Sequence, residues 1–356
     1  MNAKGEEQSM RKKKAITLQH IADAAGVSVQ TVSKALRGLT GVSEQERHRL
    51  FYMAQQMGYA SKAQERAQTV EQIPLHSSKP YRFKLILPSR SSKANLMNPL
   101  LAEGLQQKMT LLGHTVEQLA LPAEGKLSVE AWARLHQLEH YDGLFLAPML
   151  DKESLEAILQ YSVPQILIYF VKPGMRADSV IWDVGAAVRQ SVEYLVQHGH
   201  HRILYIGDYL EEWRGFVLRW DAFVMTMREY GLTAAREDHM LRVRTTDRRS
   251  NMDEFAYMVR KMNITAVLCG VNYHLSWIYR ACAENGIRIP EHLSLISLEN
   301  TTNPSWPELS RPKLRIREAG ARAAERMLWR IANPNAPYEH TMLQGDFVPG
   351  KTVMSL

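Results

Sequence analysis

The fold of the N-terminal part of this chain is decided by residues 18–37, LQHIADAAGVSVQTVSKALR. Apolar residues recur at helical spacing over 18–25 and again over 29–36. Gly26 stands between the two runs and tolerates the positive φ that a tight turn between helices requires. Ser28 is a good N-cap for the second helix. The stretch therefore predicts a helix-turn-helix.

The neighbouring residues predict a three-helix head. Ala22 is small at the point where the first two helices cross, and Thr17 is placed to cap the first helix. A third helix is expected to begin at Ser43, which forms a capping box with Glu46, and to end at Gly58. The apolar residues with the spacing of a buried seam are Ile21, Val27, Val32 and Leu36.

This arrangement predicts where DNA would be contacted. A helix-turn-helix directs the N-terminal residues of its second helix at base edges in the major groove. We expect Gln30 to pair with adenine, Lys34 to donate to guanine and Val29 to press on a thymine methyl. Other polar groups suit the phosphates, which orient the protein without specifying sequence. The remaining candidates for DNA contact are Thr17, Ser28, Thr31, Ser33 and Arg37.

The charge distribution points to the same end of the chain. Residues 1–80 carry 12 basic and 7 acidic residues, a net charge of +5, whereas the remaining 276 residues carry only +2. A basic excess of this kind favours a nucleic-acid partner. On charge alone, residues 1–16 would equally suit a solvated basic tail. Together with the motif, they are interpreted as a basic arm that precedes a DNA-binding domain.

Length and composition exclude several classes of protein. The chain has 356 residues, 45% of them hydrophobic and 23% charged, which is ordinary for two or three globular domains. It holds no apolar run near the roughly 18 residues of a membrane helix. The N-terminus lacks the apolar region of a signal peptide. Cys269 and Cys282 are too few for a disulfide framework or a zinc site, so we expect a cytoplasmic protein without metal or cofactor.

Four segments are expected along the chain. The basic arm over 1–16 precedes the helix-turn-helix domain over 17–60, and a polar linker that holds Pro74 fills 61–80. From 81 to 356, short apolar strands alternate with amphipathic helices, which predicts an α/β domain with parallel, doubly wound sheets. This length suits two lobes, with a ligand between them at the carboxyl ends of the strands. The expected strands are 83–88, 143–147, 165–169, 203–206, 266–269 and 293–297, and expected helices are 99–112, 186–198 and 220–230.

With these motifs in place, the chain resembles the lactose-repressor (LacI/GalR) family of bacterial transcription regulators. The residues that carry the resemblance are TLQHIADAAGVSVQTVSKAL over 17–36, VSEQERHRL over 42–50 and MGY over 57–59. Further motifs follow in the family's order up to about residue 320. They include Asn98-Pro99, Tyr141–Leu144, Val163-Pro164, His198–Ile203, Thr265–Val267 and Ile289–Ser294.

The resemblance implies a transcriptional regulator, most simply a repressor. It implies a body like a periplasmic sugar-binding protein, with two lobes around a small-molecule effector. It also implies that the protein forms a homodimer and catalyses no reaction. The effector class it implies is a sugar or a related metabolite, and the DNA partner is a pseudo-palindromic operator. An enzyme is therefore not expected.

Effector residues carry over from the family position by position. Arg219 stands three residues before Ala222-Phe223, where the family has Gly-Phe, and its planar fork suits two oxygens at once. Arg214, before Gly215-Phe216, is the rival candidate. The other effector residues that the resemblance implies are Asp183, Asn272 and Glu299. At the position of Glu299 the family more often has Asp. Trp306 suits stacking on a sugar face, although core packing is the simpler role for a tryptophan there.

The linker departs from the family pattern. Family members place Pro-Asn after the tyrosine and a leucine that wedges into the minor groove. Here Tyr59 is followed by Ala-Ser-Lys, the wedge position is Gln68, and Glu65 would lie near phosphates. Glutamine has polar groups to desolvate and glutamate is repelled by DNA. We therefore expect a degenerate hinge and a loose tether between the two heads of a dimer.

Alternative functions remain at this point. One is a regulator without small-molecule control, whose body serves dimerisation or a protein partner. Another is a solute-binding protein or sugar-acting enzyme with an incidental helical head. The histidines of the 198–203 motif also suggest a metal site, but they flank the end of a predicted helix, where histidines interact with free carbonyls. We therefore expect no metal there.

Overall fold

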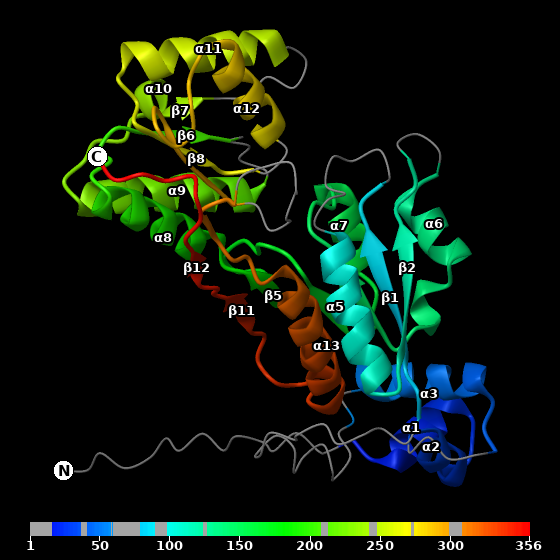
Figure 1. The fold of residues 1–356 in the computed structure, drawn as a ribbon. Coiled ribbons are helices and arrows are strands. Elements are labelled where there is room, and N and C mark those ends of the chain that lie inside the picture. Colours follow the sequence, from blue (N-terminus) through cyan, green and yellow to red (C-terminus); the bar gives the residue numbers. More distant parts are fainter. Residues whose placement is uncertain are drawn as a thin grey trace, which may run out of the picture. The chain divides into compact units, whose positions relative to one another are not determined.

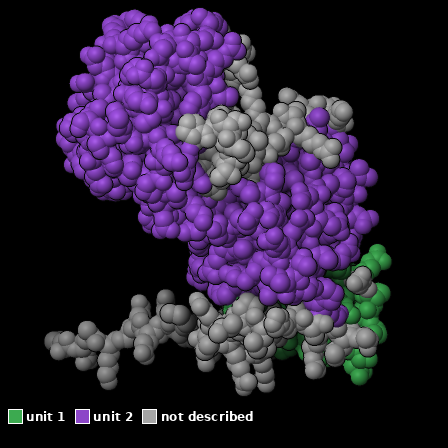
Figure 2. Space-filling view, in the orientation of Figure 1, with its two compact units in different colours: residues 1–73, 332–336 green, residues 74–331, 337–356 purple. Residues whose placement is uncertain are grey.

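The computed structural model describes residues 16–36, 41–57, 59, 79–89, 98–123, 127–207, 213–241, 248–271, 274–298 and 308–356. The chain forms two compact units, which Figure 2 colours separately. One unit consists of residues 1–73 with 332–336, and the other of residues 74–331 with 337–356. None of the helices among the described residues is both long enough and apolar enough to cross a membrane.

The N-terminal unit is a three-helix head, formed by α1 (Leu18–Ala25), α2 (Val29–Leu36) and α3 (Glu44–Gln56). The first two helices have the bounds that the apolar periodicity predicts. Gly26 ends α1 in the left-handed conformation, with φ 69°, as the tight turn requires. The three helices share one small apolar core, whose fully buried members are Ile21, Ala22, Val32, Ala35, Leu50 and Ala54.

The larger unit begins with a six-stranded sheet, the first lobe, in which neighbouring strands are parallel. Its spatial order is β11-β5-β4-β3-β1-β2. The strands are β1 (Arg82–Leu87), β2 (Thr115–Ala120), β3 (Gly143–Leu146), β4 (Gln165–Leu167), β5 (Asp178–Trp182) and β11 (His340–Leu343). The connections from β1 to β4 are helical, as is usual between parallel strands, whereas residues 168–177 join β4 to β5 without a helix. The helices are α5 (Asn98–Leu111), α6 (Val129–Leu135), a 3-10 turn (Leu138–His140), α7 (Lys152–Leu159) and α13 (Ile316–Ala332).

Helices α5 and α13 cross at very short range, side by side in Figure 1. A Cβ atom on Gly104 of α5 would lie 1.9 Å from the carbonyl oxygen of Arg317, and a Cβ on Gly320 of α13 would lie 2.2 Å from that of Leu101. Only glycine fits at these two positions, because the backbone of one helix occupies the space that a side chain on the other helix would need. This crossing ties the C-terminal helix to the first helix of the lobe.

The second lobe is built on a four-stranded parallel sheet with the order β7-β6-β8-β9. Its strands are β6 (Ile203–Ile206), β7 (Met240–Leu241), β8 (Ala266–Cys269) and β9 (Ser294–Ser297). The helices of this lobe are α8 (Val184–Gln197), α9 (Arg214–Glu229), α10 (Arg236–His239), α11 (Arg248–Lys261) and α12 (Leu275–Glu284). Strand residues in β6, β8 and β9 are buried throughout, as expected of a sheet covered on both faces.

The chain passes between the lobes in both directions. It enters the second lobe after β5 and returns to the first after β9, through the short strand β10 (Arg311–Pro312). After β11 it crosses again through β12 (Phe347–Val348), which pairs with β10 in antiparallel register. The C-terminal segment then lies along β9, where Leu295 and Thr352 exchange hydrogen bonds of 2.7 and 2.6 Å. The lobes are therefore joined by several segments distant in sequence.

The predicted fold class is confirmed, with local corrections. The strands over 203–206 and 266–269 have the predicted bounds, whereas β4 ends two residues early, at Leu167. Helix α9 starts at Arg214, six residues before the predicted start at 220. Six of the described strands were not predicted, namely β2, β5, β7, β10, β11 and β12. β2 is a polar edge strand without an apolar run, and β5 begins with a buried aspartate that masks its apolar character.

Candidate DNA-binding and effector sites

The second helix of the head carries the candidate base-reading residues. Gln30 is exposed at the start of α2, as predicted, and Lys34 is half-buried. Val29 is also half-buried and packs against the core of the head, so it is less outward-facing than its position suggested. An exposed amide near the N-terminus of a recognition helix has the reach to pair with a base edge. Of the three candidate base-reading residues on α2, Gln30 is thus the one that is exposed.

The hydroxyl groups around this helix serve its own N-terminus. Ser28 Oγ accepts a hydrogen bond of 3.1 Å from the backbone N–H of Thr31 and lies 2.8 Å from the Thr31 hydroxyl. Ser28 is therefore the predicted N-cap. At the first helix, the backbone N–H of Thr17 donates to Nδ1 of His20 at 3.0 Å. Thr17 is exposed, and Ser33 is half-buried. Arg37 lies outside the described residues.

The third helix is bonded to the end of the first. Ser43 accepts a hydrogen bond of 3.2 Å from the backbone N–H of Glu46, as expected for the N-terminus of this helix. The Glu46 carboxylate pairs with Arg49 at 2.7 Å, and this hydrogen bond lowers the pKa of Glu46. Arg49 also donates to the carbonyl oxygen of Ala25 at 2.9 Å. The end of α1 is thereby tied to α3 just before the turn at Gly26.

Arg219 is the candidate effector residue whose surroundings are best described. It lies on α9, its side chain is buried with 4% of the residue exposed, and its Nη1 donates to the carbonyl oxygen of Gly215 at 2.7 Å. The guanidinium carbon is 5.5 Å from the ring centre of Phe216 and 6.0 Å from that of Phe170. Such cation–π distances stabilise a desolvated arginine. Arg214, the rival candidate, begins the same helix and is half-buried.

Asp183 has a structural role where the chain enters the second lobe. It is the N-cap of α8, and its Oδ1 accepts a hydrogen bond of 2.9 Å from the backbone N–H of Ala186. The positive, N-terminal end of the helix dipole also stabilises a carboxylate at this position. The remaining effector candidates, Asn272, Glu299 and Trp306, lie outside the described residues.

Sequence reasoning missed the aromatic neighbours of Arg219. Phe170 follows β4 in the first lobe, and its ring meets that of Trp182, the last residue of β5, edge-on at 6.0 Å. The indole nitrogen of Trp182 is buried and has no hydrogen-bond partner among the described residues. Phe170 directly follows the strand expected over 165–169, and a residue just past the carboxyl end of a parallel strand is the signal that would have pointed to it.

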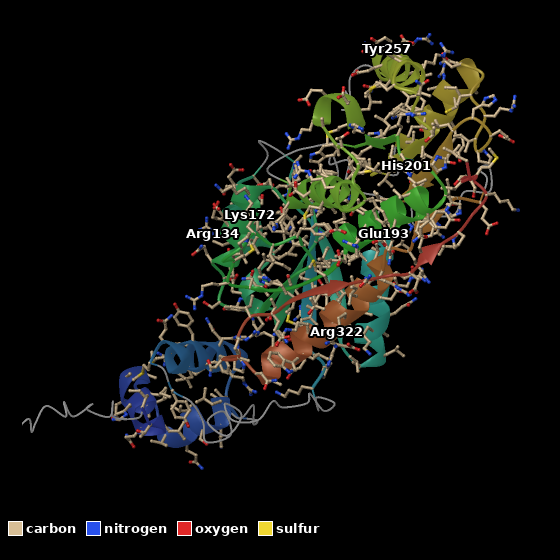
Figure 3. All side chains as sticks on the ribbon, turned by 90° about the vertical axis from the view of Figure 1, so that its left-hand side faces the viewer. Arg134, Lys172, Glu193, His201, Tyr257 and Arg322 are labelled. Atoms are coloured by element: carbon tan, nitrogen blue, oxygen red, sulfur yellow. The ribbon has the colours of Figure 1, made fainter. Side chains whose placement is uncertain are left out.

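One histidine of the 198–203 motif contacts the C-terminal segment. His200 is buried, its Nδ1 lies 3.1 Å from the Thr265 hydroxyl and its Nε2 lies 2.9 Å from the carbonyl oxygen of Met354. Burial lowers the pKa of His200. His201, by contrast, is exposed on the surface (Figure 3). Within the described part of the chain, no group of three or more potential ligands from His, Cys, Asp or Glu could hold a metal.

Two protein-family models match the chain. Residues 17–62 match bacterial regulatory proteins of the lacI family, and residues 192–353 match a periplasmic binding protein-like domain. The first match covers the helix-turn-helix head. The second covers the second lobe together with the segments that return to the first.

Characterised relatives match nearly the whole chain. The transcriptional regulator DegA of Bacillus subtilis is 24% identical over 316 residues, which are 86% of this chain and 88% of DegA. The catabolite control protein A of Priestia megaterium is 22% identical over 80% of this chain and 83% of its own length. Each match covers more residues than the 276 of the body over 81–356.

Solved structures share the fold. The Lac repressor dimer bound to operator and the anti-inducer ONPF has a TM-score of 0.63 at 21% identity, covering 96% of this chain and all of its own. The complex of the regulator CelR with cellobiose has a TM-score of 0.66 at 17% identity, and the match covers 95% of this chain and 99% of the CelR chain. With a lacI-type head at one end, a periplasmic-binding-protein-like body behind it, and regulators aligned along its length, this chain belongs to the lacI family of bacterial regulatory proteins.

Proposed function

We propose that this protein is a sequence-specific transcriptional repressor that binds a pseudo-palindromic operator as a homodimer. The observation that carries the proposal is the geometry of the head. Helix α2 is capped by Ser28 and follows a left-handed turn at Gly26, and it presents Gln30 to solvent. Since one helix reads only a short half-site, two heads are needed for a useful operator.

The body is proposed to bind a small molecule between its two lobes, and the effector changes operator affinity. The carboxyl ends of parallel strands are where open sheets bind ligands, and Arg219 and Phe170 lie there. The relatives give the class, because CelR is seen with cellobiose and the Lac repressor with ONPF. We infer a carbohydrate or related metabolite, bound with Arg219, Asp183, Asn272, Glu299 and Trp306 as contacts.

The protein is proposed to perform no chemistry and to need no cofactor, since the relatives that it matches are regulators. Its target is the chromosome, so we place it in the bacterial cytoplasm at the nucleoid. The domain limits that we propose are a basic arm over 1–16, the head over 17–60, a linker over 61–80 and the body over 81–356. The family match to the head, over 17–62, supports the second of these limits.

A regulator without small-molecule control is the second candidate. It is favoured by the internal contacts of two proposed ligand residues, since Asp183 caps α8 and Arg219 bonds to Gly215. A thermal-shift screen of sugars separates the two candidates. A ligand at 100 times its Kd should stabilise the body by about 2.7 kcal/mol. Absence of any shift across the screen would favour the second candidate.

Selection from random DNA duplexes tests the main proposal. The purified full chain is offered the pool at two salt concentrations. We expect enrichment of an inverted repeat and an affinity that falls steeply with salt, because the arm and head neutralise phosphates. Salt-sensitive binding without any enriched sequence would contradict a sequence-specific regulator.

A further inference from the structure

One aromatic side chain, Phe170, makes a contact between the two lobes of the body. Phe170 comes from the first lobe, after β4, and its ring lies against the N-terminal turn of α9 in the second lobe. A Cβ atom added to Gly215 would lie 2.8 Å from Cδ2 and 2.9 Å from Cε2 of Phe170. Real side-chain carbons do not approach so closely, so the ring rests directly on a backbone position that only glycine leaves open.

The same ring covers the candidate effector arginine. Arg219 lies one helical turn after Gly215, and its guanidinium carbon is 6.0 Å from the centre of the Phe170 ring. On its other side, Phe170 meets Trp182 edge-on, with ring centres 6.0 Å apart. Trp182 is part of the apolar core that includes residues of both lobes. Phe170 is thus held from the first lobe while it contacts two residues of α9.

We propose that Phe170 is a coupling residue that helps to hold the two lobes together by packing on Gly215 and over Arg219. An effector that reaches Arg219 shares or replaces this contact, so its binding changes how firmly the lobes are joined. This second step rests on the proposed function, whereas the contact itself does not. The ring would also form one wall of the site, which favours an effector with a flat face beside Arg219.

A double-mutant cycle tests the contact. Gly215→Ala places a methyl group into the Phe170 ring, so it should force the ring away and raise amide hydrogen exchange at least fivefold over residues 165–175 and 213–220. Phe170→Ala should raise exchange in the same segments by removing the contact. In the Phe170→Ala background the methyl group meets no ring. Its remaining close neighbour is Arg219 Nη1 at 3.1 Å, the end of a long side chain that can shift, so Gly215→Ala should then change exchange less than twofold. Equal effects of Gly215→Ala in both backgrounds would overturn the proposal.

Tyr169→Ala is the matched control. Tyr169 is also half-buried, but it packs within the apolar cluster of the first lobe alone. Its loss should leave exchange over 213–220 within twofold of the wild type. An increase equal to that of Phe170→Ala would mean that any damage to this loop loosens α9, which overturns a specific role for Phe170.

Operator affinity tests the coupling. With the operator from the selection and no added small molecule, Phe170→Ala should change affinity at least fivefold, and Tyr169→Ala less than twofold. Altered exchange with unchanged affinity would overturn the coupling. If no operator is selected at all, the proposed function fails, while the exchange cycle still decides whether Phe170 joins the lobes. Circular dichroism of each variant, including the double variant, separates these effects from misfolding.

Discussion

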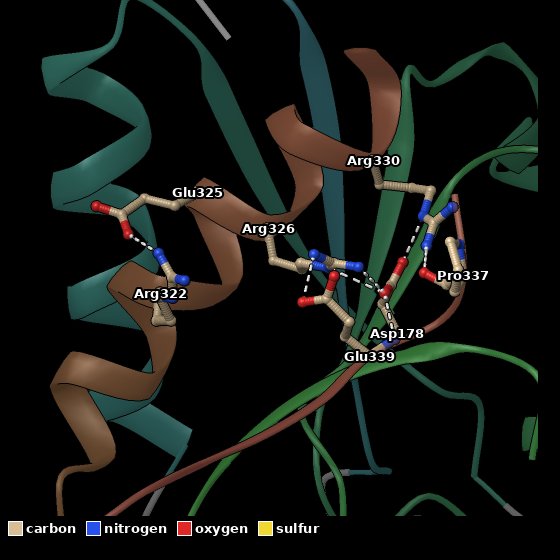
Figure 4. A network of polar contacts seen from close by, with 7 residues as sticks. All are labelled: Asp178, Arg322, Glu325, Arg326, Arg330, Pro337 and Glu339. Atoms are coloured by element: carbon tan, nitrogen blue, oxygen red, sulfur yellow. Dashed lines mark hydrogen bonds and ion pairs between the residues drawn. The ribbon is translucent and has the colours of Figure 1, made fainter. Parts of the chain in front are cut away.

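Asp178 at the start of β5 is fully buried, and its Oδ1 accepts two hydrogen bonds from Arg326 of α13, at 2.9 and 2.6 Å (Figure 4). Its other oxygen accepts from Arg330, one turn further along the helix. Arg326 also pairs with Glu339 at 2.8 Å, so two arginines face two carboxylates. The cluster joins β5 to α13 and to Glu339, the residue before β11, across about 150 residues of sequence.

Replacing Asp178 with alanine should destabilise the body severely. The substitution leaves two buried guanidinium groups with half of their countercharge, and breaking a buried pair in this way costs about 3–5 kcal/mol. Urea unfolding of the full chain followed by circular dichroism measures the loss. Glu325→Ala, which removes a partly exposed carboxylate paired with Lys108 and Arg322, is the control and should cost at most about 1 kcal/mol. Equal losses for both variants would contradict this ranking.

His200 should make stability depend on pH. The unfolded chain binds a proton on this histidine near its ordinary pKa of 6.5, whereas burial lowers the pKa of His200 in the folded protein. As the pH falls below about 6.5, the unfolded state gains protons that the folded state does not, so the free energy of unfolding decreases. His200→Gln should therefore lose less of its Tm between pH 7.5 and 5.5 than the wild type does. Superimposable pH profiles would refute this, and exposed His201→Gln serves as the control.

Gln30 should specify one base pair of the operator. Truncating it to alanine removes a bidentate contact and should weaken binding by about 1–3 kcal/mol, roughly 5- to 150-fold, while relaxing preference at that base pair. Binding to the selected operator and its single-base variants measures both effects. Gln19→Ala, on the first helix and hydrogen-bonded to Asp23, should change affinity little. A uniform loss on all sequences would assign Gln30 to a phosphate instead.

The linker should tolerate variation in the distance between half-sites. Gln68 at the wedge position and the repelled Glu65 predict a loose tether, although both lie outside the described residues. Footprinting on operators with one or two base pairs inserted between half-sites measures this tolerance, and we expect less than about tenfold loss. Restoring a wedge with Gln68→Leu should sharpen the spacing preference. A steep loss for the wild type on one inserted base pair would show that the heads are rigidly joined.

The head was the part of the fold that the sequence predicted best. Helix periodicity, the cap at Ser28 and the glycine at 26 are local signals, and both of the first two helices have their predicted bounds. Local signals do not predict an element whose burial depends on contacts with residues distant in sequence. β5 begins with Asp178, which is buried only because Arg326 and Arg330 arrive from a helix about 150 residues away.

The candidate effector site was predicted less completely. Arg219 was found from its place before Ala222-Phe223, and it is buried near the other lobe, but its closest neighbours were not anticipated. Phe170 belongs to a strand end in the first lobe, and nothing in a linear pattern says which helix that strand end meets. Such contacts follow from how two lobes are joined, which the periodicity of either lobe alone does not contain.

The central claim, a dimer that reads an inverted repeat, is tested most directly by the stoichiometry of operator binding. The selected operator and a duplex with one half-site replaced are titrated with the full chain in an analytical ultracentrifuge. We predict two chains per intact operator and an affinity at least 100-fold lower for the single half-site, because only the intact repeat engages both heads of a dimer. One chain per duplex, with equal affinity for both, would contradict the account.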